Sequence, residues 1–215
     1  MNYKPTDYLD LLIKRYPELD PCKESIFHAY ELLKNCYEHS GKLLICGNGG
    51  SAADAEHIVG ELMKGFVLPR KINELYAKQL REIDPELGGI LAENLQGTLQ
   101  AIALDGHPSL TTAYMNDVEP LLCFAQQVNG YGCTGDTLLA ISTSGNSKNV
   151  LFAAVTAKAK GIRVIGLTGA KNSKLSSIAD VCIQVPETET YMIQELHLPV
   201  YHCLCLMLEA YFYTT

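Results

Sequence analysis

The feature of this chain that most constrains its fold is a pattern of strand, loop and helix. A short apolar run from Leu43 to Cys46 stops at a glycine-rich loop, Gly47 to Ser51, and a helical spacing of apolar residues follows from about Ala52 to Phe66. An apolar run without polar alternation is typical of a strand that is covered on both faces. The pattern therefore predicts a buried strand that leads through a tight loop into a helix.

The same pattern occurs a second time along the chain. Residues Thr137 to Ile141 are apolar, Ser142 to Ser147 form a small polar loop, and Asn149 to Lys160 have helical spacing. Strands that alternate with helices predict an α/β fold around a parallel sheet. Further apolar runs bring the expected number of buried strands to about five; they are Leu99 to Leu104, Val164 to Leu167 and Val181 to Val185.

Helical segments flank this predicted core. The spacing of apolar residues predicts two N-terminal helices within residues 1–40. A last helix is expected from Glu189 to Tyr213, with a kink at Pro199, because proline has no backbone N–H to donate. Residues of about 69–97 are polar and amphipathic and predict an inserted helical excursion. No linker divides the chain, so we expect residues 1–215 to form a single domain.

Charge and composition exclude several classes of protein. The formal net charge is -7, so the chain lacks the basic surface that direct nucleic-acid binding requires. No apolar run approaches the roughly 20 residues of a membrane-spanning helix, and the polar start has no secretory pattern, so we expect a cytoplasmic protein. The eight cysteines are scattered through apolar segments, which favours free, mostly buried thiols over disulfides or a cysteine-ligated metal.

The glycine-rich loop lies where a strand ends and a helix begins. Backbone N–H groups and the helix dipole can hold an anion at such a position, although the glycines equally suit a tight turn without a ligand. Gly47, Gly49 and Ala52 also match the spacing of a dinucleotide-binding fingerprint. That motif needs an acidic residue at the end of the next strand, and Glu61 lies inside the predicted helix instead, so we do not expect a dinucleotide cofactor.

The second loop is rich in hydroxyl groups at the equivalent position. Serine and asparagine are ordinary turn and cap residues, but four hydroxyls in residues 142–147 exceed what a helix cap requires. Hydroxyls and backbone amides can bind a phosphate monoester without a lysine. This loop therefore predicts a phosphate-binding site that suits an acidic chain.

Two predicted helices carry candidate catalytic side chains. His57 and Glu61 are four residues apart and share one helix face, and Gln194 and His202 lie two turns apart on the C-terminal helix. A carboxylate among apolar neighbours is costly unless it is paired, metal-bound or catalytic. Histidines on apolar helices are often only hydrogen-bonded core residues, so spacing alone leaves both interpretations open.

Three segments together resemble the signature stretches of sedoheptulose-7-phosphate isomerases, which belong to the sugar isomerase (SIS) class. They are residues 46–57 (CGNGGSAADAEH), residues 142–147 (STSGNS) and residues 193–197 (IQELH). They also resemble the DnaA initiator-associating protein, a non-catalytic relative. The segments occur in the order found in the family, and the resemblance covers most of the chain apart from residues 69–97.

The resemblance implies a three-layer αβα sandwich with a five-stranded parallel sheet, a sugar phosphate as ligand, Zn²⁺ as cofactor, and a homotetramer with active sites between subunits. The side chains implied to hold the phosphate are those of Ser51, Ser142, Thr143, Ser144 and Ser147. The implied sugar contacts are Asn48, Gly49, Gly50, Gln194 and Asp117, the last in a loop after the strand Leu99 to Leu104. The implied zinc ligands are His57, Glu61, Gln194 and His202.

The implied activity is an aldose-ketose isomerisation, of sedoheptulose 7-phosphate to D-glycero-D-manno-heptose 7-phosphate. Moving a proton between C1 and C2 through an enediol requires a base, an acid and a group that stabilises the developing oxyanion. By resemblance Glu61 is the base and His202 the acid. A glutamate that ligates zinc is a poorer base, and the sequence leaves that conflict open.

Two features depart from the family pattern and keep an alternative function open. Tyr191 stands where the family usually has an aspartate, and the insertion at 69–97 is absent from its phosphoheptose isomerases. The alternative is a non-catalytic sugar-phosphate sensor or protein-binding adaptor, for which the insertion would supply a binding surface. An adaptor need not keep an acid, a base and metal ligands together, and their joint presence favours the enzyme.

Overall fold

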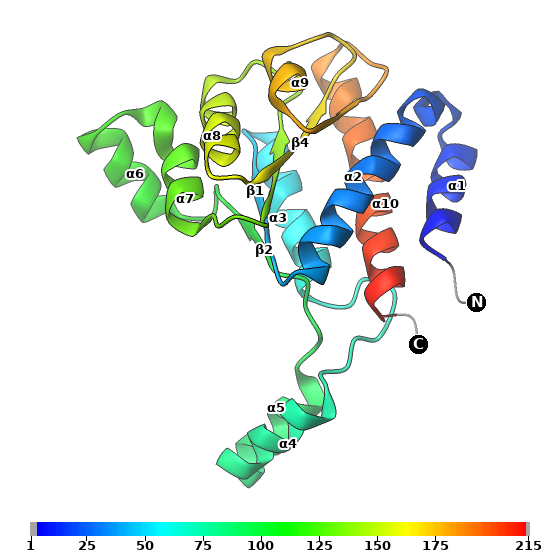
Figure 1. Ribbon diagram of the computed structural model, residues 1–215, viewed down its shortest axis with the longest axis vertical. Helices are drawn as coiled ribbons and strands as arrows, with labels where there is room; N and C mark the ends of the chain where they lie inside the picture. Colours follow the sequence, from blue (N-terminus) through cyan, green and yellow to red (C-terminus); the bar gives the residue numbers. More distant parts are fainter. Residues whose placement is uncertain (1–3, 214–215) are drawn as a thin grey trace.

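The computed structural model describes residues 4–213, and its centre is a five-stranded, all-parallel sheet with helices on both faces (Figure 1). The strand order is β2-β1-β3-β4-β5. The strands are β1 (Leu43–Cys46), β2 (Ala101–Ala103), β3 (Thr137–Ile141), β4 (Arg163–Thr168) and β5 (Val181–Gln184). The α/β class and the five parallel strands predicted from the sequence are confirmed.

The helices predicted from the sequence are present, and the structure adds three α-helices that were not predicted, at residues 108–117, 123–131 and 174–178, and two short 3-10 segments. Within the described residues, no helix is long and apolar enough to cross a bilayer. The α-helices are α1 (Pro5–Arg15), α2 (Lys23–Glu38), α3 (Gly50–Met63), α4 (Glu74–Ile83), α5 (Pro85–Asn94), α6 (Pro108–Asp117), α7 (Cys123–Tyr131), α8 (Lys148–Ala159), α9 (Lys174–Ile178) and α10 (Thr190–Tyr213). The 3-10 segments are η1 (Pro17–Cys22) and η2 (Pro120–Leu122).

Two hydrophobic cores lie on opposite faces of the sheet. Successive side chains of a strand point to opposite faces, so β3 contributes Leu139 and Ile141 to one core and Leu138 and Ala140 to the other. Helices α1, α2, α3 and α10 cover the first core, and α7, α8 and α9 cover the second. The result is the expected three-layer αβα sandwich (Figure 1).

The insertion forms a helical hairpin, α4 and α5, that projects away from the sandwich (Figure 1). Asn73 and Asp84 begin the two helices, because their side chains accept hydrogen bonds from first-turn N–H groups. At the base of the hairpin, the Gly97 N–H donates to the carbonyl oxygen of Arg70 over 2.8 Å. The prediction of a helical excursion in this part of the chain is confirmed.

Some predicted boundaries are wrong for identifiable reasons. Helix α3 ends at Met63 rather than near Phe66, because the backbone N–H of Phe66 donates to the carboxylate of Glu209. Asp117 is the last residue of α6 and not part of a loop. None of the residues of α6 is buried, so its sequence lacks the apolar periodicity that predicts a helix. Helix α10 continues through Pro199.

Candidate functional site

The two candidate loops lie side by side at one edge of the sheet. They follow β1 and β3, which pair in parallel with Leu43 opposite Thr137. The strand order reverses between β1 and β3, because the chain passes from β1 to β2 on one side and continues with β3 on the other. Ligands of open α/β sheets bind at such a switch point. The side-chain amides of Asn48 and Asn149 exchange hydrogen bonds of 3.0 and 2.7 Å and so join the two loops.

The glycine-rich loop brings the C-terminal helix to the start of α3. Gly49 has a φ of 58°, in the left-handed region that glycine tolerates best. A Cβ atom at position 50 would lie 2.6 Å from Nε2 of Gln194. Glycine at this position therefore allows the Gln194 side chain of α10 to lie against the first turn of α3, where Ser51 is buried.

The hydroxyl loop presents polar side chains beside a cavity. Ser142 is buried, and its Oγ lies 3.0 Å from Oγ of Ser147. Thr143 and Ser144 line a cavity of about 230 Å³, which Lys171 also lines. The loop leads directly into the N-terminus of α8, where unpaired N–H groups favour an anion.

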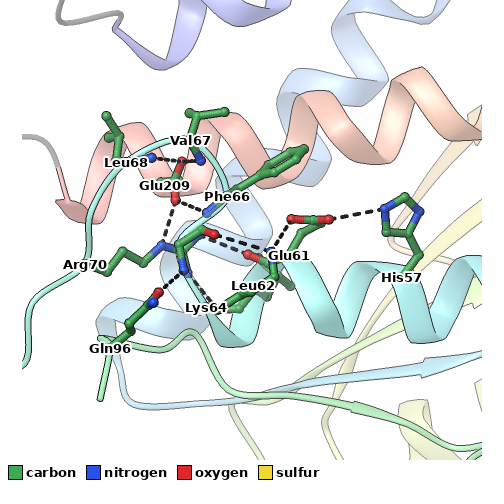
Figure 2. Close-up of polar contacts among 11 residues, drawn as sticks. His57, Glu61, Leu62, Lys64, Phe66, Val67, Leu68, Arg70, Gln96 and Glu209 are labelled. Carbon is green, nitrogen blue, oxygen red and sulfur yellow. Dashed lines mark hydrogen bonds and ion pairs between the residues drawn. The ribbon is translucent and has the colours of Figure 1, made fainter. Parts of the chain in front are cut away.

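His57, Glu61 and His202 form a cluster between α3 and α10. Nε2 of His57 lies 3.2 Å from Oε1 of Glu61 (Figure 2), and the side chain of Glu61 is only 13% exposed. The ring centroids of His57 and His202 are 5.0 Å apart. Lys64 lies over the other carboxylate oxygen, with Nζ to Oε2 at 3.2 Å. The structure therefore brings the predicted acid and base to one place.

Tyr201 and Asp54, which were not predicted from the sequence, form a hydrogen-bonded chain with the ring nitrogen of His57 that faces away from Glu61. Nδ1 of His57 lies 3.0 Å from the hydroxyl of Tyr201, and that hydroxyl donates to Oδ1 of Asp54 over 3.2 Å. This contact occupies one ring nitrogen and leaves Nε2 facing Glu61, which fixes the orientation of the ring. The available signal was the spacing of Asp54 and His57, which places them one turn apart on α3.

The surroundings of His202 favour its neutral form over its charged form. Burial, and after it the neighbouring His57 ring, lower the pKa of His202 below its ordinary value. Among the described residues its buried Nε2 has no hydrogen-bond partner. A neutral, unpartnered ring nitrogen can accept a proton or bind a cation. His202 also lines an apolar cavity of about 370 Å³ between α1 and α10.

The predicted metal ligands are only partly gathered. In residues 4–213 no group of three or more His, Cys, Asp or Glu side chains lies close enough together to hold a metal ion. The donor types still fit zinc, which is bound by imidazole nitrogen and carboxylate oxygen. The unpartnered Nε2 of His202 and the Nε2 of His57 that faces Glu61 are the nitrogens such an ion would use.

Asp117 is not brought to this cluster. Its carboxylate accepts a hydrogen bond from the side chain of the adjacent Asn116. Helix α6 packs beside α7, across the sheet from α3 and α10 (Figure 1). A sugar contact by Asp117 stays a prediction.

Comparisons with known proteins agree with this geometry. The SIS domain family model matches residues 7–77 and 77–169, and the two matches meet inside the inserted hairpin. A phosphoheptose isomerase from Rhodospirillum rubrum is 39% identical over 191 residues, which span 89% of this chain and 88% of that protein. The solved structure of phosphoheptose isomerase from Neisseria gonorrhoeae matches with a TM-score of 0.73 and 32% identity, over 95% of this chain and 96% of that one. The structure of a phosphoheptose isomerase from Francisella tularensis matches with a TM-score of 0.74 and 30% identity, over 94% of this chain and 95% of that one.

The matched residues, the sheet order and the two adjacent loops show that the chain belongs to the SIS domain family. Within that family it is an isomerase, similar over most of its length to proteins named phosphoheptose isomerase. The family and the isomerase class predicted from the three sequence segments are confirmed.

Proposed function

We propose that this isomerase interconverts an aldose and a ketose sugar phosphate, namely sedoheptulose 7-phosphate and D-glycero-D-manno-heptose 7-phosphate. The observation that carries the proposal is the cluster of His57, Glu61 and His202, which lies between α3 and α10. Helix α3 starts from one of the two candidate ligand loops, and Asn48 and Asn149 join these loops. The names and identities of the relatives support the choice of a heptose phosphate.

In this proposal the hydroxyl loop holds the phosphate. Ser142, Thr143, Ser144 and Ser147 donate hydrogen bonds, the N-terminus of α8 adds its dipole, and Ser51 binds from the neighbouring loop. A site of hydroxyls and backbone amides does not require a fixed positive charge, which agrees with the net charge of -7. Asn48, Gly49, Gly50 and Gln194 then contact the sugar.

Glu61 is proposed as the base and His202 as the acid. The side chain of Glu61 is only 13% exposed, so its carboxylate is partly desolvated at the point where, in this proposal, a sugar carbon loses its proton. His202 lies in the same cluster, and its buried Nε2, which has no hydrogen-bond partner among the described residues, can exchange a proton with a sugar oxygen. Tyr201 and Asp54 keep the neighbouring His57 ring in place.

We propose Zn²⁺ as the cofactor, held by His57, Glu61, Gln194 and His202. When bound, the ion would polarise the sugar oxygens as a Lewis acid. Gln194 lies at the first turn of α3 and the two histidines lie further along the same pair of helices. These donors are not gathered in the described residues, so binding the ion would require their side chains to move.

The test is to purify the protein without chelator, determine its bound metal by mass spectrometry, and follow sedoheptulose 7-phosphate with and without added zinc. We expect conversion that zinc restores after chelation. If complete removal of metal left conversion unchanged, the proposal of Zn²⁺ as cofactor would be contradicted, but the proposed isomerisation would not. Binding of the sugar phosphate without conversion, with zinc present, would instead favour the sensor or adaptor.

We also propose that the chain assembles as a homotetramer. The hairpin supports self-association, because it presents large apolar side chains to solvent and the sandwich does not cover them: Leu75, Ile83, Leu87 and Ile90 are exposed by 68, 84, 61 and 56%. Sedimentation velocity should give four times the chain mass. A monomer at micromolar concentration would contradict this assembly.

A further inference from the structure

A fully buried ion pair lies at the end of α3, outside the cluster that the proposed reaction uses. Nε of Arg70 is 2.8 Å from Oε1 of Glu209, and both side chains are 0% exposed (Figure 2). Removing two charges from water is costly unless their remaining hydrogen-bonding positions are satisfied. The backbone groups that hydrogen-bond to Arg70 and Glu209 therefore identify the part of the chain that this ion pair fixes.

The carboxylate of Glu209 is the centre of the turn that follows α3. Oε1 accepts the N–H of Phe66 over 2.7 Å, and Oε2 accepts those of Val67 and Leu68 over 2.9 and 3.1 Å. Three successive amides that converge on one anion form a compact nest. The turn between α3 and the hairpin is therefore wrapped around a side chain of α10.

The guanidinium of Arg70 closes the same structure from the other side. Its Nη1 donates to the carbonyl oxygen of Leu62 over 2.7 Å, and its Nη2 donates to that of Glu61 over 3.1 Å (Figure 2). Carbonyls in the last turn of a helix have no partner within the helix. Arg70 thus bonds directly to the backbone of the residue proposed as the base.

Helices α3 and α10 contact each other at three successive levels. Gln194 lies against Gly50, His202 lies beside His57, and Glu209 binds the turn after Met63. The helices therefore run parallel, and the ion pair fixes their relative position about two turns beyond His202. A shift of one helix along the other would move Glu61 away from His202.

We propose that Arg70 and Glu209 are positioning residues, which keep the backbone of Glu61 level with His202 along the axes of α3 and α10. The inference rests on the proposed function, in which these two residues are base and acid. Neither Arg70 nor Glu209 touches the reacting atoms. Their effect is on geometry, to which reaction rates are sensitive, since a displacement of about 1 Å can cost on the order of 100-fold in rate.

The sharpest variant is Arg70→Lys. Lysine keeps the positive charge, but its single ammonium does not reproduce the planar fork that reaches Glu209 and two backbone carbonyls together. The matched control is Arg163→Lys, which alters the exposed ion pair of Arg163 with Asp180, where Nη1 and Oδ1 are 2.9 Å apart. Should Arg70→Lys not fold, Glu209→Asp retains the charge and shortens the side chain by one methylene.

Three measurements on each full-length variant separate positioning from stability: kcat and KM for sedoheptulose 7-phosphate, the thermal midpoint, and a crystal structure. For Arg70→Lys, assayed well below its midpoint, we expect kcat to fall about 10- to 100-fold with KM within about threefold. The distance between the Glu61 carboxylate and the His202 ring should change in its crystal structure. Arg163→Lys should match the wild type in both.

An unchanged kcat and an unchanged Glu61–His202 distance in Arg70→Lys, with only a lower midpoint, would overturn the proposal and leave the pair a purely structural role. A wild-type protein that does not convert the sugar phosphate would refute the proposed function instead. The crystallographic distance still decides the positioning role in that case, because it does not depend on turnover.

Discussion

The two ends of the contact between α3 and α10 are built in opposite ways. At the N-terminal end, Gly50 makes room for the uncharged side chain of Gln194, beside a loop that carries backbone N–H groups. At the C-terminal end, the contact is an ion pair with no solvent exposure, Arg70 with Glu209. The proposed acid and base lie between these ends.

The two ends of this helix pair therefore differ in how freely they can change partners. A polar but uncharged side chain such as that of Gln194 can form hydrogen bonds to a ligand without leaving a buried charge unpaired. A buried charged end has no such freedom, because each partner that leaves exposes an uncompensated charge. We infer that the helices are fixed at one end so that the other can accept a ligand.

Replacing the proposed acid is expected to have the largest effect on activity. His202→Gln removes the ring nitrogen that exchanges a proton, so kcat should fall by about 100- to 10,000-fold. The control is His28→Gln, at an exposed position on α2. Steady-state assays of both folded variants measure the difference, and equal rates would contradict the role of His202.

Breaking the buried pair should have the largest effect on stability. Glu209→Leu leaves the charge of Arg70 uncompensated, so the free energy of unfolding should fall by about 3–5 kcal/mol. The double variant Arg70→Met with Glu209→Leu should not recover that loss, because the N–H groups of residues 66–68 still lack an acceptor. Urea denaturation of both variants is the measurement. Full recovery in the double variant would show that these amides find water instead.

A smaller effect is expected at the open end. Gly50→Ala places a methyl group against Gln194, whose flexible side chain must move aside, so kcat/KM should fall by roughly 10-fold while stability changes by less than about 1 kcal/mol. Gly60→Ala is the matched control, since a Cβ atom there meets nothing within 4 Å. That control should keep full activity, and equal losses in both variants would argue against a role for Gln194.

The smallest effect is expected in the hydroxyl loop, where several donors share one ligand. Ser147→Ala removes the partner of the Ser142 hydroxyl and should raise KM by about 5- to 10-fold, which corresponds to about one hydrogen bond. Thr156→Ala, whose exposed hydroxyl donates to the carbonyl of Phe152 within α8, is the control. An unchanged KM in Ser147→Ala would place the phosphate elsewhere.

The sequence predicts the regular parts of the fold well. The apolar runs at Leu43 to Cys46 and Thr137 to Ile141 coincide with β1 and β3, since buried parallel strands leave an unambiguous pattern. The predicted end of α3 and the prediction of a loop at Asp117, where the structure has α6, were wrong. The end of α3 depends on a carboxylate more than 140 residues away in sequence, and α6 is a helix without a buried face.

In the candidate site, too, the sequence predicts contacts within one helix but not contacts between distant helices. The pair His57 and Glu61 follows from local helix geometry, whereas the contact of His202 with His57 depends on the packing of two distant helices. Glu209 carried a signal that could have been used. It is the only charged residue between Leu196 and Tyr213, and the argument applied to Glu61, that a carboxylate among apolar residues needs a partner, holds there as well. The partner itself, Arg70, lies in the insertion and is not identifiable from spacing.

The most direct test of the central claim is an NMR time course of sedoheptulose 7-phosphate with the zinc-supplemented wild type and with Glu61→Gln. The amide removes the proposed base at nearly unchanged volume. We expect the wild type to form the aldose product, and Glu61→Gln to stay folded and bind the sugar phosphate without converting it. Product formation at the same rate in both proteins would contradict the account, because another group would then remove the proton.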